Sequence, residues 1–210
     1  MATSTRAAPK LQIEPLDHDR WPDLAELFSR PGLSIARNCY CMFYRRSGRH
    51  EPPPGMTNSE ANKRALMSLV ARGVVPGLLG YESGRAIGWV SLGPREDYAR
   101  LVRSPVMKAV DDKPVWSIIC FVVDPGARHR GVAEAMLEGA MAWARKQGVT
   151  LLEAYPCDKR GKASDDSMWF GAKSMFDRAG FVEVARRKPM RPVMRKKLRA
   201  SSIQERRRER

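Results

Sequence analysis

The segment from Val115 to Gly148, VWSIICFVVDPGARHRGVAEAMLEGAMAWARKQG, constrains the fold more than any other part of the chain. Its first part, Val115–Val123, is mainly apolar and β-branched, is too short to cross a membrane, and is typical of a strand buried on both faces. Asp124-Pro125-Gly126 then ends this strand. Farther on, apolar residues recur close to helical spacing, at Val132, Met136, Ala140, Trp143 and Ala144. They predict a helix that ends near Gly148.

A short basic loop, Arg128–Ala133, joins the predicted strand to the predicted helix. It carries three basic side chains, and Gly131 allows the backbone to come close to a ligand. A helix N-terminus leaves N–H groups unpaired and carries partial positive charge, so a phosphate placed there gains hydrogen bonds and about 0.3–1 kcal/mol from the helix dipole. Neither GxxxxGK with a following Ser or Thr nor GxGxxG follows the strand. The loop therefore predicts an anion site of another kind.

The loop resembles the acetyl-CoA motif of the GNAT acetyltransferases. In that motif an Arg or Gln is followed by two residues, a Gly, one residue, and a Gly or Ala, after a strand that ends near Val-x-Pro. Arg128, Gly131 and Ala133 match the motif, and Val123-Asp124-Pro125 matches the strand end. The resemblance continues in chain order over about Val75–Leu198.

The segments that follow the predicted helix extend this resemblance. Thr150–Tyr155 predicts a second strand, and a helix ends with Met175–Ala179 before a Gly-Phe turn, as in the closing helix of the family. Phe181–Arg187 and Arg191–Leu198 predict a final pair of strands. The resemblance implies an α/β (α+β) GNAT fold, with a mixed, mostly antiparallel sheet that splays beside its central strand to admit acetyl-CoA.

The N-terminal half predicts further elements of the same domain. Strands are expected at Leu11–Leu16 and, as a hairpin, at Pro76–Tyr81 and Ala86–Leu92. Helices are expected at Trp21–Arg30, after a capping box at Thr57–Glu60, and, as a short insertion, near Asp97–Val102. The segment Ser34–Gly55 is less regular, and the resemblance implies that it forms one wall of the acceptor pocket.

Composition limits the class of protein. A chain of 210 residues with 43% hydrophobic content fits one domain, which we place at residues 11–198, between a disordered N-terminus (1–10) and a basic C-terminal tail (199–210). No apolar run approaches the roughly 18 residues of a spanning helix, and the first ten residues lack the apolar middle of a signal peptide. We therefore expect a soluble, cytoplasmic protein.

The four cysteines do not form a disulfide scaffold in a chain of this length. Cys39 and Cys41 have no second pair at zinc spacing, and the three histidines are scattered, so we predict no metal site. The two cysteines stand among aromatic residues and are expected to pack or to line a pocket. Cys120, beside the expected thioester, is interpreted as a small buried side chain, and Cys157 has no evident His partner.

The net charge of +15 is concentrated near the C-terminus. Residues 186–210 hold twelve basic and two acidic residues, a net +10, which leaves +5 for the rest of the chain. A solvated tail is one interpretation, and contact with nucleic acid is the alternative, although the tail has no aromatic residue that could stack on bases.

The resemblance assigns the cofactor site residue by residue. It implies that the backbone of Phe121, Val122 and Val123 pairs with the pantetheine arm as an extra half-strand. It also implies that the pyrophosphate is held by Arg128, His129, Arg130, Gly131, Val132 and Ala133. Because N–H donors hold the diphosphate, acetyl-CoA is the only co-substrate expected, without a metal.

The family's catalytic positions hold different side chains in this sequence. An alkylammonium of pKa about 10.4 must lose a proton before it attacks, which at pH 7 requires about 4–5 kcal/mol from a base or from desolvation. A Tyr that often protonates the leaving thiolate aligns with Phe176, and a frequent Asn aligns near Trp169. The Glu that is the base in the histone-modifying branch aligns with Ser117, whose hydroxyl could only position a water.

The remaining catalytic candidates lie on and after the next predicted strand. Glu153 and Tyr155 occupy alternate positions and so share one face, where Tyr155 could serve as the acid. For Glu153 the alternative is a strand carboxylate paired with an arginine. Asp165 and Asp166 in the following loop are better explained as helix caps.

Together these features predict an N-acetyltransferase that passes an acetyl group from acetyl-CoA directly to a primary amine. The acceptor is a small molecule, or a lysine or N-terminus of a protein or peptide. One alternative is a nucleic-acid-associated acetyltransferase or adaptor that uses the basic tail, for instance with an aminoacyl-tRNA amine. The other is a non-catalytic acyl-CoA sensor, suggested by Phe176. A homodimer is expected from the resemblance alone.

Overall fold

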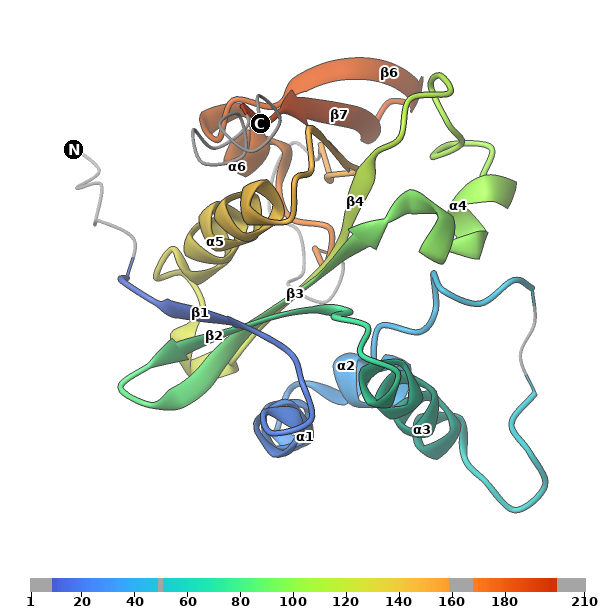
Figure 1. Ribbon diagram of the computed structural model, residues 1–210, viewed down its shortest axis with the longest axis vertical. Coiled ribbons are helices and arrows are strands. Elements are labelled where there is room, and N and C mark those ends of the chain that lie inside the picture. The colour runs from blue at the N-terminus through green and yellow to red at the C-terminus, as the bar shows by residue number, and fades with distance from the viewer. Residues whose placement is uncertain (1–8, 49–50, 159–167, 200–210) are drawn as a thin grey trace, which may run out of the picture.

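The computed structural model describes residues 9–48, 51–158 and 168–199 (Figure 1). The strands are β1 (Gln12–Pro15), β2 (Gly77–Glu82), β3 (Arg85–Pro94), β4 (Trp116–Val123), β5 (Leu151–Ala154), β6 (Val182–Lys188) and β7 (Arg191–Lys197). They form one seven-stranded sheet in the order β1-β2-β3-β4-β5-β7-β6. β4 and β5 run parallel, and the other neighbours run antiparallel. The predicted mixed, mostly antiparallel sheet is therefore confirmed.

Helices cover both faces of this sheet. They are α1 (Trp21–Ser29), α2 (Ser34–Cys39), α3 (Asn58–Ala71), α4 (Ala99–Arg103), α5 (Val132–Lys146) and α6 (Lys173–Arg178), with 3-10 turns at Arg95–Asp97 and Pro125–Ala127. Figure 1 shows α1, α2 and α3 on one side of the sheet and α5 on the other. Buried side chains of α1, α2 and α3 belong to one hydrophobic cluster, those of α5 and α6 to another, and Leu101 of α4 to a third.

Most predicted elements recur with small shifts at their ends. The capping box is confirmed, because the Thr57 hydroxyl accepts a hydrogen bond from the Glu60 N–H (3.2 Å) and the Glu60 carboxylate accepts one from the Thr57 N–H (2.8 Å). The short helix expected near Asp97 begins two residues later, at Ala99. The sequence does not predict α2, because its six residues bury Ala36 alone and no side chain caps its start.

The sheet opens beside β4. β5 pairs with β4 over Trp116–Ile118 and diverges beyond that point. On the other side, β3 stays paired with β4 to Val123, and its register skips Ile119 in a β-bulge. Bulges bend a strand and re-aim its side chains. The second half of β4 therefore presents one backbone edge to a gap in the sheet.

α5 is held close to the sheet by glycines. A Cβ on Gly139 would lie 2.5 Å from a side-chain carbon of Ile13, and one on Gly88 would lie 2.9 Å from the Met136 sulfur. Only glycine leaves room for this approach. Because α5 follows β4 after a short loop, the approach places the N-terminus of α5 at the end of the opened strand.

Several expectations fall outside the described residues. They are the disorder of most of the N-terminal ten residues, the state of the C-terminal tail beyond Arg199, and the capping role of Asp165 and Asp166. Among the described residues, no helix is long and apolar enough to cross a membrane.

Candidate functional site

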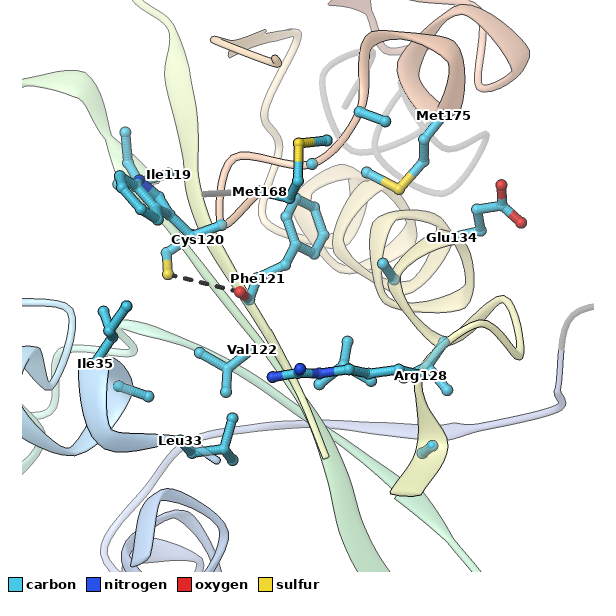
Figure 2. Close-up of a pocket in the computed structure, with 18 of the residues that line it drawn as sticks. Leu33, Ile35, Ile119, Cys120, Phe121, Val122, Arg128, Glu134, Met168 and Met175 are labelled. Atoms are coloured by element: carbon cyan, nitrogen blue, oxygen red, sulfur yellow. Dashed lines mark hydrogen bonds between the residues drawn. The ribbon is translucent and has the colours of Figure 1, made fainter. Parts of the chain in front are cut away.

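A cavity of about 840 Å³ lies beside the opened half of β4 (Figure 2). Ile119–Val123 of β4 line its centre, and the loop from Ala127 to Gly131 with the start of α5 lines one end. One wall comes from the α1–α2 turn, α2 and the residues after it. The opposite wall comes from residues 168–178. A cavity of this size falls in the usual range of small-molecule and cofactor sites.

The basic loop has the backbone geometry of an anion cradle. Gly131 has φ +80° and directly precedes α5, and His129 also has a positive φ of 58°. These two left-handed residues turn the chain so that the first N–H groups of α5 face the cavity end. The loop and α6 bring Arg128, Arg130 and Arg178 to the cavity lining. Because Arg130 pairs with Glu82 and Arg178 with Glu134, the suitability of this end for a phosphate rests mainly on the N–H donors.

A buried ion pair fixes the loop to the rest of the protein. Asp124 accepts a hydrogen bond from the Gly126 N–H at 2.8 Å and pairs with Arg30 at the end of α1. Arg30 also donates to the Ala86 carbonyl at 2.8 Å. Both charged side chains are buried, and each has a further ionic partner, Glu26 for Arg30 and Arg85 for Asp124. The sequence motif does not reveal Arg30, because it lies far away along the chain.

All residues predicted to bind the cofactor line this one cavity. They are Phe121, Val122, Val123, Arg128, His129, Arg130, Gly131, Val132 and Ala133. Their binding role stays a prediction, but their placement along one edge and one loop matches what the resemblance implies.

One backbone contact at this edge is not expected from the sequence. The Phe121 N–H, which points into the gap, donates a hydrogen bond to the Trp169 carbonyl at 2.7 Å. Trp169 itself lines the cavity. A pantetheine arm that pairs with Phe121 would have to replace this carbonyl.

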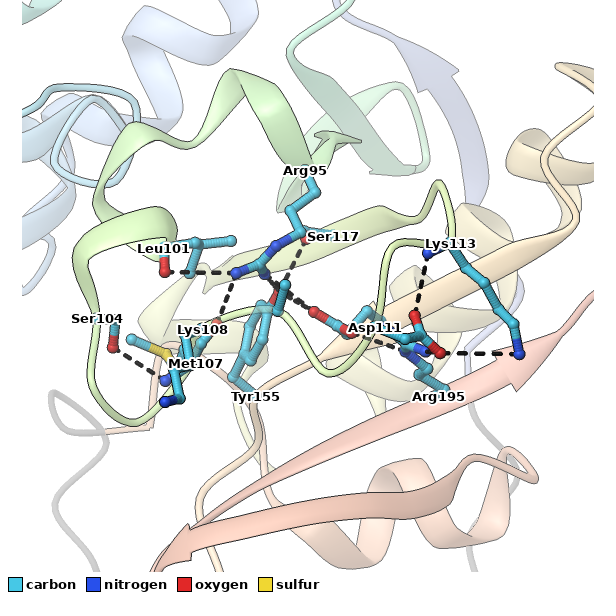
Figure 3. Close-up of polar contacts among 12 residues, drawn as sticks. Arg95, Leu101, Ser104, Met107, Lys108, Asp111, Lys113, Ser117, Tyr155 and Arg195 are labelled. Atoms are coloured by element: carbon cyan, nitrogen blue, oxygen red, sulfur yellow. Dashed lines mark hydrogen bonds and ion pairs between the residues drawn. The ribbon is translucent and has the colours of Figure 1, made fainter.

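The predicted catalytic residues meet one another, but outside the cavity lining (Figure 3). The Tyr155 hydroxyl donates to Glu153 Oε1 at 2.5 Å and lies 3.0 Å from Ser117 Oγ. Arg95 Nη1 donates to Glu153 Oε1 at 3.0 Å, and Arg195 Nε donates to Oε2 at 2.7 Å. Glu153, Tyr155 and Ser117 are all fully buried.

This network fastens the sheet to the segment that precedes β4. Arg95 also donates to the Met107 carbonyl at 2.8 Å, and Arg195 pairs with Asp111 at 2.8 Å. Burial, followed by the neighbouring Glu153 carboxylate, raises the pKa of Tyr155 well above its usual value. The phenol therefore keeps its proton in the physiological range. The geometry agrees with the alternative for Glu153, a strand carboxylate paired with arginine.

Phe176, at the position of the family's acid, belongs to the core. It is fully buried and packs edge-on against Phe181 (5.1 Å between ring centroids) and against Phe121 (6.2 Å). These contacts tie α6 to β4 and to the start of β6. The phenyl ring of Phe176 cannot donate a proton to the leaving thiolate.

The wall formed by α2 and the residues after it is apolar and aromatic. Its cavity residues include Leu33, Ile35, Cys39, Cys41, Phe43 and Tyr44. Ile35 and Phe43 are each 50% exposed, and Trp169 on the opposite wall is 36% exposed. The family resemblance points to this region as a whole, but nothing in the local sequence marks the individual residues. Within the described ranges, no cluster of His, Cys, Asp and Glu could hold a metal ion.

Solved acetyltransferases share this fold. A mosquito arylalkylamine N-acetyltransferase-like 5b is 13% identical, with 90% of this chain and 100% of that chain covered and a TM-score of 0.55. PaiA N-acetyltransferase of Thermoplasma acidophilum, solved with coenzyme A, is 16% identical over 90% of this chain and 99% of that chain, with a TM-score of 0.51. A third structure is described as histone acetyltransferase HPA2 and related acetyltransferase of Corynebacterium glutamicum. It is 18% identical over 92% of this chain and 99% of that chain, with a TM-score of 0.51. At such identities the likeness shows the fold alone, and no curated protein matches the sequence.

Family membership comes from the sequence itself. Residues 40–164 match the model of the Acetyltransferase (GNAT) family, which is more than half of the chain. The matched stretch holds much of the apolar wall, the opened strand β4 and the basic loop with α5. The chain therefore belongs to the GNAT acetyltransferase family.

Proposed function

We propose that this chain transfers an acetyl group from acetyl-CoA to a primary amine. The observation that carries the proposal is the continuity of one surface. The edge of β4 beyond its pairing with β5 leads directly into the Gly131 turn and the N-terminus of α5, all within one cavity. An extended arm with a diphosphate at its end matches that surface, because the strand edge supplies peptide hydrogen bonds and the helix supplies anion-binding N–H groups.

Each part of the donor then has its own partners. The pyrophosphate lies at the start of α5, near Gly131 and Ala133, with the loop's basic side chains around it. The pantetheine arm pairs with Phe121 and Val123 after the Trp169 carbonyl has moved aside. Exchange of one hydrogen bond for another costs little, since the net value of a typical bond is about 1 kcal/mol.

The acceptor side favours an amine on an apolar body. Ile35 and Phe43 present exposed hydrophobic surface to the cavity, and the Arg100 guanidinium lies 3.8 Å above the Phe43 ring. Aromatic and aliphatic walls bind rings and chains by burying their surface. We therefore place small apolar or aromatic amines first, and lysine or N-terminal amines of peptides second.

Glu153, Tyr155 and Ser117 are assigned a structural role in this proposal. They are fully buried and satisfied by one another and by two arginines. A group that touches substrate has to reach the cavity, and these three do not line it. The base and the acid therefore come from elsewhere.

Calorimetric titration of acetyl-CoA into the parent and an Ala133→Asp variant tests the proposal. Ala133 lies in the first turn of α5, where a carboxylate stabilises the helix but repels a phosphate. We expect micromolar binding by the parent and its loss in this variant. Ala142→Asp, the same change at an exposed position of α5 away from the cavity, should bind like the parent. If the folded parent does not bind acetyl-CoA, the proposal is wrong.

Release of free coenzyme A distinguishes an enzyme from a sensor. We expect apolar primary amines to accelerate thiol release from acetyl-CoA by the parent protein. Binding without acceleration by any amine or peptide would favour the acyl-CoA sensor. The homodimer, the cytoplasmic location and a nucleic-acid partner stay predictions from the sequence.

A further inference from the structure

The proposed course of the donor places its reacting end at one half of β4. The pyrophosphate is assigned to the start of α5 and the arm to Val123 and Phe121, so the arm runs back along β4 away from α5. Ile119 and Cys120 come next in this direction, and Figure 2 shows them on the part of the strand farther from Arg128. Pairing between β4 and β5 ends just before Ile119. The thioester and its leaving sulfur therefore belong beside Ile119 and Cys120.

The leaving sulfur needs a source of protons. Coenzyme A is expelled as a thiolate, and a thiol of pKa about 8.5 is protonated at pH 7. A positioned acid typically accelerates such a step by about 10²–10⁴-fold. Several charged or titratable side chains of the lining belong to the α5 end, where the pyrophosphate is assigned: Arg128, His129, Arg130, Glu134 and Arg178. Among the other described lining residues, the side chains with an O–H or S–H group are Tyr44, Cys39, Cys41 and Cys120.

The three thiols are engaged within the protein. The Cys120 thiol donates to the carbonyl of its neighbour Phe121 at 3.8 Å. The Cys41 sulfur accepts a hydrogen bond from Trp89 Nε1 at 3.2 Å, and the Cys39 sulfur faces backbone N–H groups of the turn that follows α2. This leaves the phenol of Tyr44 as the candidate acid.

Tyr44 borders the half of β4 to which the thioester is assigned. Of the five tyrosines, all within the described ranges, Tyr44 alone lines the cavity. Tyr44 and Cys120 pack against one hydrophobic cluster, to which Ile119 belongs. The Tyr44 ring also stands edge-on to Phe170, with 5.3 Å between ring centroids. Phe170 directly follows Trp169, whose carbonyl accepts a hydrogen bond from the edge of β4.

The Tyr44 hydroxyl is left open by the fold. Among the residues that the structure describes, no hydrogen bond engages this hydroxyl, and its oxygen keeps contact with solvent. Three other tyrosines use their hydroxyl groups in contacts with side chains of the protein: Tyr81, Tyr98 and Tyr155. A fixed ring with an unengaged hydroxyl is suited to meet a substrate atom.

The surroundings of Tyr44 keep its phenol protonated. Burial raises the pKa of Tyr44 above its usual value, and the positive charges of Arg191 and Arg100 oppose this rise. Cys120 and Cys39 are the other titratable groups that act on it, and both are neutral while they hold their protons. At pH 7 the phenol therefore carries a proton that it can give to a thiolate.

We propose that Tyr44 is the general acid that protonates the leaving thiolate of coenzyme A. The inference rests on the proposed function, because the donor must first lie along β4. It assigns the proton source to the wall formed by α2 and the residues after it. The α6 position of Phe176 has no proton to give, and the hydroxyl of Tyr155 does not reach the cavity lining.

The proposed step balances with the groups already named. A neutral amine attacks the carbonyl carbon of the acetyl thioester, and the C–S bond breaks as the Tyr44 O–H proton passes to sulfur. The products are the free thiol of coenzyme A, an N-protonated amide and the Tyr44 phenolate. The phenolate then takes the proton from the amide nitrogen, directly or through water, and the phenol is restored. The acetyl group passes directly to the amine, without an acyl-enzyme.

Steady-state kinetics of Tyr44→Phe test the proposal. This change keeps the ring that packs against Phe170 and removes only the hydroxyl. With an apolar primary amine as acceptor, we expect kcat to fall about 100-fold or more, while the Kd for acetyl-CoA stays at the parent value. Tyr81→Phe removes a hydroxyl that donates to Asp23 at 2.6 Å outside the cavity lining, and should keep the parent kcat. The thermal unfolding midpoint of each variant checks that it is folded.

The pH profile separates a proton donor from a structural hydroxyl. An acid acts only while it is protonated, so the parent kcat should fall at alkaline pH as Tyr44 ionises. Replacement of Tyr44 by a ring-fluorinated tyrosine gives a more acidic phenol, and should move this fall to lower pH. In Tyr44→Phe the fall should be absent. A profile that the fluorinated residue leaves unmoved would contradict the proposal.

Calorimetry with acetyl-CoA separates the possible failures. If the parent transfers acetyl groups and Tyr44→Phe does so at the parent rate, the acid proposal is wrong and the proposed function stands. Loss of acetyl-CoA binding by folded Tyr44→Phe would make Tyr44 a binding residue and would also overturn its role as acid. Binding by the parent without amine-dependent thiol release leaves no transfer step for an acid, and overturns it too. If the folded parent does not bind acetyl-CoA, both proposals fail together.

Discussion

Substitution of Glu153 can show whether this buried residue has a structural or a catalytic role. We expect Glu153→Gln to lower the free energy of unfolding by about 3–5 kcal/mol, because Arg95 and Arg195 lose the buried carboxylate that they share, although Arg195 keeps its pair with Asp111. Urea denaturation measures this change. Acetyl-CoA affinity should stay at the parent value, since Glu153 does not line the cavity.

Glu183→Gln is the matched control for this substitution. Glu183 pairs with Arg186 on the surface of β6, and such exposed pairs contribute at most about 1 kcal/mol. Unchanged stability of Glu153→Gln together with abolished acetyl transfer would instead restore the catalytic interpretation of Glu153.

The sequence predicts residues best where their partners are close along the chain. Arg128 and Gly131 are found because a contiguous motif carries them, and the shared face of Glu153 and Tyr155 follows from the strand period of two. Arg95 is missed as the partner of Glu153, because 58 residues separate the two. The contact between the Trp89 N–H and the Cys41 sulfur is missed for the same reason, since 48 residues separate the two.

The fit of α5 on the sheet makes a prediction at the scale of an element. Alanine is normally favoured over glycine inside a helix by about 1 kcal/mol. At Gly139, however, the new methyl group would lie 2.5 Å from a side-chain carbon of Ile13 and 3.0 Å from its Cβ, so β1 must shift. We expect Gly139→Ala to be destabilising by about 1–3 kcal/mol, as for other overpacked sites, in thermal or urea unfolding.

The neighbouring exposed residue provides the control. Glu138→Ala changes the same helix without approaching the sheet, and should alter the free energy of unfolding by less than about 0.5 kcal/mol. An increase in stability for Gly139→Ala would show that α5 has room against β1, contrary to the structure.

Elements with a strong period are predicted, and elements set by tertiary contacts are not. β4 and α5 follow from apolar runs and helical spacing, and α3 from its capping box. α2 is short and has little periodicity, so its helix depends on packing against α1 and α3. The Trp169 carbonyl that meets β4 lies in a segment without a pattern, and only the folded arrangement reveals it.

At the scale of the whole molecule, the positions of the strands change the interpretation of the basic C-terminal region. The basic C-terminal region that the sequence singles out includes β6 and β7, whose arginines are engaged in internal contacts. Arg186 pairs with Glu183 and Asp158, and Arg195 with Glu153 and Asp111. Arg187 donates to the carbonyls of residues 106, 108 and 109. Much of this basicity therefore belongs to the domain rather than to a tail.

The remaining tail limits any nucleic-acid partner. Beyond Arg199 the sequence holds four arginines and two glutamates, and no aromatic residue. Four cations that each displaced one counterion from single-stranded RNA would change the slope of log affinity against log salt by about 3 at most. Because the tail has no aromatic side chain on which bases could stack, it adds little further affinity for single-stranded RNA.

We therefore expect the chain lacking residues 200–210 to bind acetyl-CoA as the full chain does, and to differ from it only slightly in affinity for single-stranded RNA at physiological salt. Fluorescence anisotropy with labelled RNA, repeated over a range of salt concentrations, measures the second quantity, and calorimetry measures the first. A tight, salt-sensitive RNA complex that the truncation abolishes would show that the tail is an interaction segment. In that case an acceptor amine carried by RNA would rank above the apolar amines favoured by Ile35 and Phe43.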